Sequence, residues 1–276
     1  MPGGVGGGRP RGPSLSRLAC LFHPYGVENQ PVTERSPALT NTNSTQDSKV
    51  RIGAIRWLVR ETLGNLILIA ILFGIVGRWN WGMGWALSGI YILWTVSTAI
   101  LILPINPAML AERSRPHADT RKWDMVLMGA TGLLMVAEYV TASLDVRLSW
   151  SPQLPLALQI MGLVASIVGY DFLLVWAMVS NAFFVTTVRI QTERQHTVVS
   201  GGPYRYMRHP GYLGNLLLHW GVPFMLNSLW AIIPASMLTV VLIVRTALED
   251  KTLHAELPGY KEYAERVRYR LLPGLW

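Results

Sequence analysis

Long apolar stretches alternate with short polar segments along the chain from residue 57 onward. A helix rises 1.5 Å per residue, so roughly 20 apolar residues cross about 30 Å of hydrocarbon. Six stretches approach or exceed this length, at residues 57–76, 82–103, 125–144, 154–184, 212–226 and 229–248. The pattern predicts an all-α polytopic protein with about six transmembrane helices.

The lengths of these stretches indicate how the last helices are arranged. The stretch at 154–184 is longer than a bilayer requires, so we expect it to tilt or to project beyond the membrane. The stretch at 212–226 is short, and only Asn227 and Ser228 separate it from the next one. The last two stretches are therefore predicted to form a helical hairpin.

Residues 1–50 show no such pattern. They are rich in Gly, Pro, Ser, Thr and Asn, which predicts a disordered polar segment. Their apolar run at 18–22 is too short for the core of a signal peptide, so we expect no cleaved leader. We divide the remainder into a first set of transmembrane helices, 51–188, and a C-terminal region, 189–276, that carries the polar motifs.

The composition narrows the class of protein. Of the 276 residues, 51% are hydrophobic and only 14% are charged, too few charges to cover a water-soluble globule of this size. The net charge of +8 comes from basic residues that are spread over several short segments. Because they form no single stripe, we expect a lipid bilayer and no nucleic acid as a partner.

Lysine and arginine gather in alternate connections. Residues 49–60 and the second and fourth connections hold four each, and the chain after residue 250 holds five. The first and third connections hold one each, Arg78 and Arg147, and the fifth holds none. Positive residues are retained on the cytoplasmic side. The distribution predicts a multi-pass protein with both termini in the cytoplasm.

Two polar segments, 189–212 and 245–273, flank the predicted hairpin on its cytoplasmic side. The first reads RIQTERQHTVVSGGPYRYMRHPGY and combines turn-forming glycine and proline with closely spaced Tyr, Arg and His. On composition alone it could equally be an interfacial loop that anchors the membrane surface. The single cysteine, Cys20, and the lack of a Cys or His set with ligand spacing predict no metal site.

The string GPYRYMRHPGYLGN, residues 202–215, resembles the signature of the isoprenylcysteine carboxyl methyltransferase and phospholipid methyltransferase superfamily. That signature has a tyrosine, the pattern Arg-His-Pro-x-Tyr-x-Gly, a helical hairpin and then a pair of acids. Here the pair is Glu249 and Asp250, with aspartate where glutamate is usual, and Pro273 ends the motif. The resemblance covers residues 189–273.

The resemblance implies a cytoplasmic pocket for S-adenosyl-L-methionine, the methyl donor of the family. An acid after the hairpin holds the methionine moiety there, and Glu249 occupies that position. The implied cofactor residues are Gln191, His196, Thr197, Val198, Val199, Tyr204, His209, Pro210, Gly211, Tyr212 and Glu249.

Arg245 lies four residues before Glu249, on the same face of the predicted helix. In the family an arginine here faces the substrate, which makes Arg245 the implied catalytic residue, suited to orienting a carboxylate or another electron-rich group. The alternative is an arginine that only snorkels to the membrane surface. A basic tail against anionic lipid is expected further on, formed by Arg266, Arg268 and Arg270 with Tyr260 and Tyr263.

The resulting functional hypothesis is a membrane methyltransferase with a lipophilic or small acceptor that carries a carboxylate, a thiol or an amine. Carboxyl methylation of an isoprenylcysteine is the family default. The polar connection at 106–124 could cap the cofactor site, gate the substrate or serve only as a linker. The alternative functions are a membrane reductase related to sterol reductases, with a nicotinamide cofactor, and a non-enzymatic membrane protein such as a transporter. The sequence shows no internal repeat of the kind that many transporters have.

Overall fold

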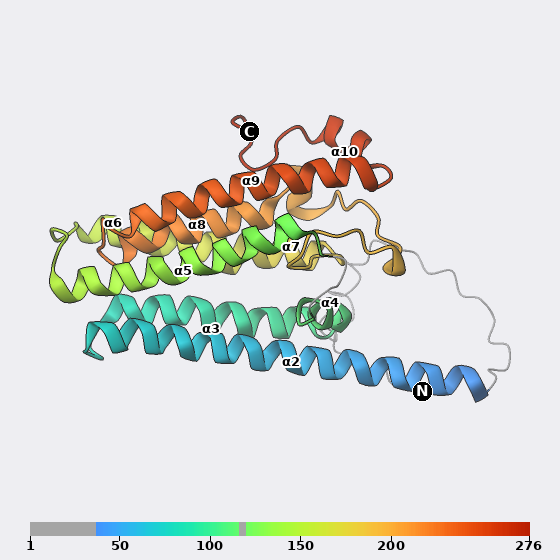
Figure 1. The fold of residues 1–276 in the computed structure, drawn as a ribbon, viewed down its shortest axis with the longest axis horizontal. Helices are drawn as coiled ribbons and strands as arrows, with labels where there is room; N and C mark the ends of the chain where they lie inside the picture. The colour runs from blue at the N-terminus through green and yellow to red at the C-terminus, as the bar shows by residue number, and fades with distance from the viewer. Residues whose placement is uncertain (1–36, 116–119) are drawn as a thin grey trace, which may run out of the picture. The chain divides into compact units, whose positions relative to one another are not determined.

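The computed structural model describes residues 37–115 and 120–276, with side chains from residue 48 onward (Figure 1). Residues 46–276 form one compact unit, and the arrangement below is that of this unit. The helices are α2 (Pro37–Val76), α3 (Gly82–Ile102), α4 (Pro107–Arg113), α5 (Lys122–Leu148), α6 (Leu156–Ser166), the π-helical η1 (Ile167–Leu174), α7 (Val175–Ser180), the 3₁₀ turns η2 (Thr192–Arg194) and η3 (Gly202–Arg205), α8 (Pro210–Met225), α9 (Ile232–Glu256) and α10 (Tyr260–Arg266).

The start of α2 differs from the sequence prediction. Residues 1–36 lie outside the described residues. Residues 37–50, which we predicted to be disordered, are helical and form the start of α2, which begins at Pro37. Proline is tolerated in the first turn of a helix, where its missing N–H would have no helical partner. The polar composition of residues 37–50 therefore did not indicate where α2 begins.

The prediction of a polytopic helical membrane protein is confirmed. Five helical segments of the described chain are long and apolar enough to cross a membrane, and they include 156–180, in which α6, η1 and α7 are continuous. The stretch at 212–226 is helical too, but α8 has only 16 residues. Helices α8 and α9 form the predicted hairpin and pack against each other.

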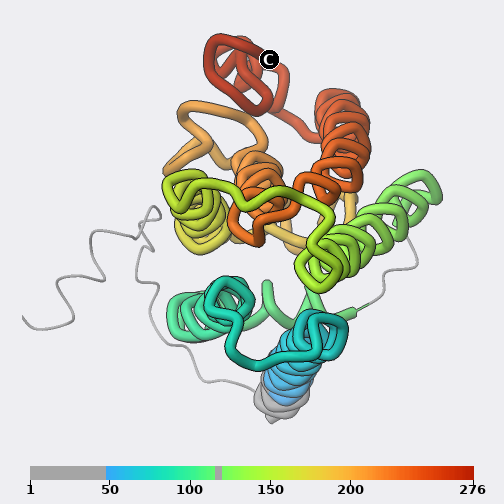
Figure 2. The backbone as a smooth tube through the Cα atoms, turned by 90° about the vertical axis from the view of Figure 1, so that its left-hand side faces the viewer, coloured from blue at the N-terminus to red at the C-terminus, as the bar shows by residue number. Residues whose placement is uncertain are grey.

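Helix α8 lies at the centre of the unit, between α6 with η1 on one side and α5 with α9 on the other (Figure 2). Glycines allow this close packing. A Cβ atom at Gly169 would lie 2.5 Å from the carbonyl oxygen of Gly214, and one at Gly162 would lie 2.5 Å from that of Gly221. Small residues let helices approach in this way in membranes, where packing rather than the hydrophobic effect holds helices together.

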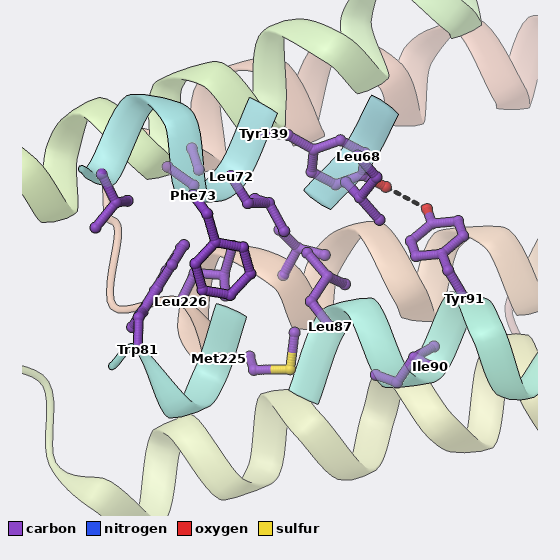
Figure 3. Packing of buried hydrophobic residues seen from close by; sticks show 14 of the residues in the cluster. Leu68, Leu72, Phe73, Trp81, Leu87, Ile90, Tyr91, Tyr139, Met225 and Leu226 are labelled. Carbon is purple, nitrogen blue, oxygen red and sulfur yellow. Dashed lines mark hydrogen bonds between the residues drawn. The ribbon is translucent and has the colours of Figure 1, made fainter. Parts of the chain in front are cut away.

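The core between α2, α3, α5 and α8 is apolar, with a few buried polar pairs. Figure 3 shows Leu72, Leu87 and Met225 within this cluster, and the hydroxyls of Tyr91 and Tyr139 hydrogen-bonded to each other. Nearby, Nδ1 of His219 on α8 lies 2.6 Å from Glu138 on α5. Pairing of such groups lowers the cost of keeping them inside a membrane protein.

Candidate functional site

A cavity of about 390 Å³ is lined by residues of α4, η3 and α10 among others. Helices α4 and α10 lie toward the same end of the bundle (Figure 1). Two hydrophobic clusters contribute to its wall. One belongs to the helical bundle and includes Trp94 and Leu174, and the other belongs to the loops and the C-terminal region and includes Tyr204 and Tyr263. Phe184 packs against both clusters, so the two parts of the cavity meet at this ring.

The structure brings most of the residues implied by the motif together around this cavity. Segments far apart in sequence contribute them, and those in the wall are His196, Thr197, Val198, Val199, Tyr204, His209, Gly211, Tyr212, Arg245 and Glu249. Gln191 and Pro210 are not among the residues that line the cavity. Gln191 is fully buried, and Pro210 is the first residue of α8.

Gln191 instead holds the loop that presents His196. Its side-chain amide donates to the carbonyl oxygen of Phe183 at 2.7 Å and accepts from Arg194 at 2.6 Å. Its backbone N–H donates to Nδ1 of His196 at 3.4 Å. Burial, together with the nearby Arg194 and Arg189, lowers the pKa of His196 to about 4. The imidazole is therefore neutral at physiological pH, and it lies against Phe183 with the ring centres 4.5 Å apart and the rings tilted by 32°.

Glu249 contributes a carboxylate to the wall of the cavity. Its Oε2 accepts a 2.5 Å hydrogen bond from the hydroxyl of Tyr212, and its side chain is half-buried. The ring of Tyr212 lies 5.9 Å from that of His209. Because a carboxylate has about four lone-pair positions, Glu249 can accept further hydrogen bonds from a cationic ligand in the cavity.

Arg245 is held by two polar partners. Its Nε donates to Asp124 at 2.7 Å and an Nη donates to the carbonyl oxygen of Thr186 at 2.5 Å. The fully buried Asp124 also accepts from the N–H of Val188 at 2.7 Å. Arg245 thus links α9 to the start of α5 and to the loop after α7, and its guanidinium lies 5.5 Å from the ring centre of Tyr212.

Asp250, the second acid of the pair, does not line the cavity. Its carboxylate is 1% exposed and accepts from Arg208 at 2.8 and 3.0 Å, from Tyr260 at 2.9 Å and from Arg270 at 2.9 Å. Nε2 of His209 lies 3.1 Å from the same carboxylate. Asp250 therefore joins the loop before α8, α10 and the C-terminal tail, and fixes the ring of His209.

The tail departs from the sequence prediction. Arg266 and Arg268 are exposed, as expected of a basic surface, but Tyr260 and Tyr263 are buried and line the cavity. The N–H groups of Arg208 and His209 donate to the carbonyl oxygens of Tyr269 and Arg270, at 3.0 and 2.9 Å. Tyr260 and Arg270 donate to Asp250 on α9, and the hydroxyl of Tyr263 donates to the carbonyl oxygen of Tyr204, so these three residues contact the rest of the protein.

Other wall residues were not singled out in the sequence analysis. They are Arg113 on α4, Phe184 in the loop after α7, and Met128, Thr131 and Met135 on α5. Arg113 and Asp124 both lie in the connection at 106–124, which was expected to cap the site, gate the substrate or serve as a linker, but neither was singled out as an individual residue. An acid in the first turn of a helix, such as Asp124, is a recognisable signal. Nothing local marks Arg113 or Phe184, because their contact joins segments far apart in the chain.

Comparison with known proteins covers the C-terminal part of the chain. Residues 150–257 match the family described as phospholipid methyltransferase. Two proteins of rice, from Oryza sativa subsp. indica and subsp. japonica, both named probable protein-S-isoprenylcysteine O-methyltransferase, are 30% identical over 113 residues. Each match spans 38% of this chain and 56% of the relative, so the chain spans about half the length of these relatives. The resemblance to the isoprenylcysteine carboxyl methyltransferase family is confirmed over this region.

Proposed function

We propose that the protein is an integral membrane methyltransferase that uses S-adenosyl-L-methionine and a lipophilic acceptor. The observation that carries the proposal is the convergence of Glu249, Tyr212, His209 and the loop 196–199 on one cavity. These residues come from the region that matches phospholipid methyltransferases. Carboxyl methylation of an isoprenylcysteine, the reaction named for the rice relatives, is the first reaction to test.

The residues present fit the donor. Glu249 would hold the ammonium group of the methionine moiety, because it is anionic, half-buried and hydrogen-bonded to a single hydroxyl. Neutral His196, Tyr204 and Tyr263 offer flat surfaces and polar atoms for the adenosine. Burial raises the pKa of both tyrosines, so both stay neutral.

The chain contributes mainly alignment and exclusion of water. When bound, S-adenosyl-L-methionine supplies a methyl group that its sulfonium has already activated. The protein needs no covalent nucleophile, because holding the two reactants in line in a dry site lowers the barrier. The buried pair of Arg245 and Asp124 fixes the wall around Tyr212, so Arg245 would orient the site through its contacts as well as face the acceptor.

The cavity fits an acceptor that comes from the bilayer. Its bundle side is formed by apolar side chains of helices long enough to cross a membrane, Trp94 on α3 and Met128 and Met135 on α5. The distribution of Lys and Arg supports a cytoplasmic location for this end of the bundle and for both termini. The donor would then enter from the cytoplasm and the acceptor from the lipid.

The test is calorimetric binding of S-adenosylhomocysteine to the full-length protein in nanodiscs. We expect micromolar affinity that Glu249→Gln weakens by about 10-fold or more, the loss of one charge-assisted interaction. Glu256→Gln is the matched control, since Glu256 lies on the same helix but is exposed and pairs with Arg121 outside the cavity. Equal affinity in wild type and Glu249→Gln would reject the role of that acid. Binding of NADPH in place of S-adenosylhomocysteine would favour the reductase.

A further inference from the structure

Arg113, the last residue of α4, is a buried cation in the wall of the cavity. Its exposed fraction is 9%, and its guanidinium lies 5.5 Å from the ring centre of Phe184. Within the described part of the chain, its Nε finds no hydrogen-bond partner. Burial lowers the pKa of Arg113 to about 10, which leaves the side chain positively charged at neutral pH.

The charged groups near Arg113 do not neutralise it. Glu61 is the acid that acts on it most strongly, but Glu61 forms its ion pair with Arg60 at 2.7 Å. Arg60 in turn donates to the carbonyl oxygen of Arg113, not to its side chain. The other groups that act electrostatically on Arg113 are Arg245, which is also a cation, and the hydroxyl of Tyr170. Among residues 48–115 and 120–276, no ion pair within 4.0 Å includes Arg113.

The two cavity arginines are therefore in different states. Arg245 has a carboxylate and a carbonyl oxygen as partners, whereas the guanidinium of Arg113 rests on an aromatic face. A buried charge without a counter-charge costs several kcal/mol. An arginine in this state inside a membrane protein is best explained by an anionic group that binds there. The cavity is the open space beside it.

The position of Arg113 indicates which ligand supplies the anion. Phe184, on which Arg113 lies, is the residue shared by the bundle cluster and the loop cluster of the cavity. Glu249 and Tyr260 line the loop side, where the donor is proposed to bind, while Trp94 and Tyr170 line the bundle side next to Arg113. The anion is thus expected on the side that the acceptor enters.

We propose that Arg113 binds the carboxylate of the acceptor and selects a lipophilic carboxylic acid over an amine or a thiol of the same chain length. A guanidinium binds a carboxylate through two parallel hydrogen bonds, and it repels an ammonium group. This assignment rests on the proposed methyltransferase function. Arg113 would then bind the carboxylate of the acceptor, while Arg245, held by Asp124 and Thr186, orients the wall around the acceptor.

The chemistry balances without a base. A carboxylate oxygen forms a bond to the methyl carbon as the carbon–sulfur bond breaks, and the electron pair of that bond stays on sulfur. The carboxylate and the sulfonium both become neutral, and no proton moves. The methyl ester has lost the charge that Arg113 recognises, so the product binds more weakly than the acceptor and can leave into the bilayer.

The experiment compares two probes on the full-length protein in nanodiscs, N-acetyl-S-farnesyl-L-cysteine and its carboxamide. Calorimetry gives their affinities in the presence of S-adenosylhomocysteine. We expect wild type to prefer the acid by about 10- to 100-fold, the range for one charge-assisted pair. Arg113→Gln should abolish the preference, and Arg113→Lys should keep part of it. Arg115→Gln is the control, because Arg115 is two residues away, lies outside the cavity wall and contacts Glu112 and Lys49.

The binding of S-adenosylhomocysteine alone separates the possible failures. Unchanged binding in Arg113→Gln shows that the variant is folded and that Arg113 does not hold the donor. Weakened binding in a variant that still purifies as a folded monodisperse protein would show that Arg113 holds the donor carboxylate, and would overturn the proposal. Equal affinity of wild type for the acid and the carboxamide would also overturn it, while leaving the methyltransferase function intact. No donor binding by wild type would reject the proposed function itself.

Discussion

Replacing Asp250 by asparagine should destabilise the fold more than any exchange of an exposed acid. The substitution keeps the shape of the side chain but removes the charge that Arg208 and Arg270 share. Breaking a buried ion pair on one side costs about 3–5 kcal/mol. Arg208 keeps its bonds to the carbonyl oxygens of Val267 and Arg268, at 2.8 and 2.7 Å, so the lower end, about 3 kcal/mol, applies.

A matched series makes this prediction specific. Asp250→Glu keeps the charge but adds a methylene group to a site with 1% exposure, for which about 1–3 kcal/mol is expected. Glu256→Gln removes an exposed ion pair on the same helix, and such pairs contribute about 1 kcal/mol or less. From most to least stable, the expected order is Glu256→Gln, then Asp250→Glu, then Asp250→Asn.

Thermal unfolding in nanodiscs, followed by intrinsic fluorescence, measures the order. A loss of about 3 kcal/mol corresponds to a fall in Tm of about 6–12 °C for a chain of this size class. Binding of S-adenosylhomocysteine should weaken as well, because Asp250 positions His209. A Tm of Asp250→Asn within about 2 °C of wild type, with unchanged ligand affinity, would refute the structural role of this carboxylate.

Three further outcomes follow from the structure. The pKa of His196 lies at about 4 in the folded protein, below its ordinary value of 6.5. Between these pH values the unfolded chain binds more protons than the folded protein, so the contribution of His196 to the free energy of unfolding falls as the pH falls from about 6.5 to 4. His196→Gln should therefore flatten the dependence of Tm on pH in that window. Gly214→Ala should cost about 1–3 kcal/mol through its clash with η1, whereas Gly64→Ala, with open space around it, should be neutral or stabilising in unfolding experiments. Arg245→Ala leaves the buried Asp124 without its cation and should lower Tm at least as much as Asp250→Asn, and a Tm equal to that of wild type would contradict the pairing.

The helices could be predicted from sequence because their signal is local. The stretches at 82–103 and 125–144 end within a few residues of α3 and α5, as hydropathy and length determine them. The short stretch at 212–226 likewise matches α8 within two residues at each end. The start of α2 could not be read in this way. The sequence of residues 37–50 is polar and gives no hydropathy signal for a helix.

The cavity was predictable where a motif marks it and not elsewhere. The resemblance identified His209, Tyr212 and Glu249, which all line it. It identified Gln191 as well, which instead supports the loop from behind. The partners of Arg245 and the exposure of Arg113 to the cavity depend on how α4, α5 and the loop after α7 meet. Spacing along the chain contains no information about such contacts.

Helix α8 is too short to reach from one surface of a bilayer to the other. Its 16 residues extend about 24 Å, less than the roughly 30 Å of a hydrocarbon core. Helix α9, the other arm of the hairpin, has 25 residues and extends about 37 Å, so Pro210 and the motif loop before it begin short of the far end of α9. Pulling a long hydrocarbon tail into water costs about 0.8 kcal/mol for each CH₂ group. Under the proposed function, a water-soluble donor that enters this recess would reach the acceptor while the tail of the acceptor remains dissolved in lipid, and the short helix would thereby avoid a costly extraction.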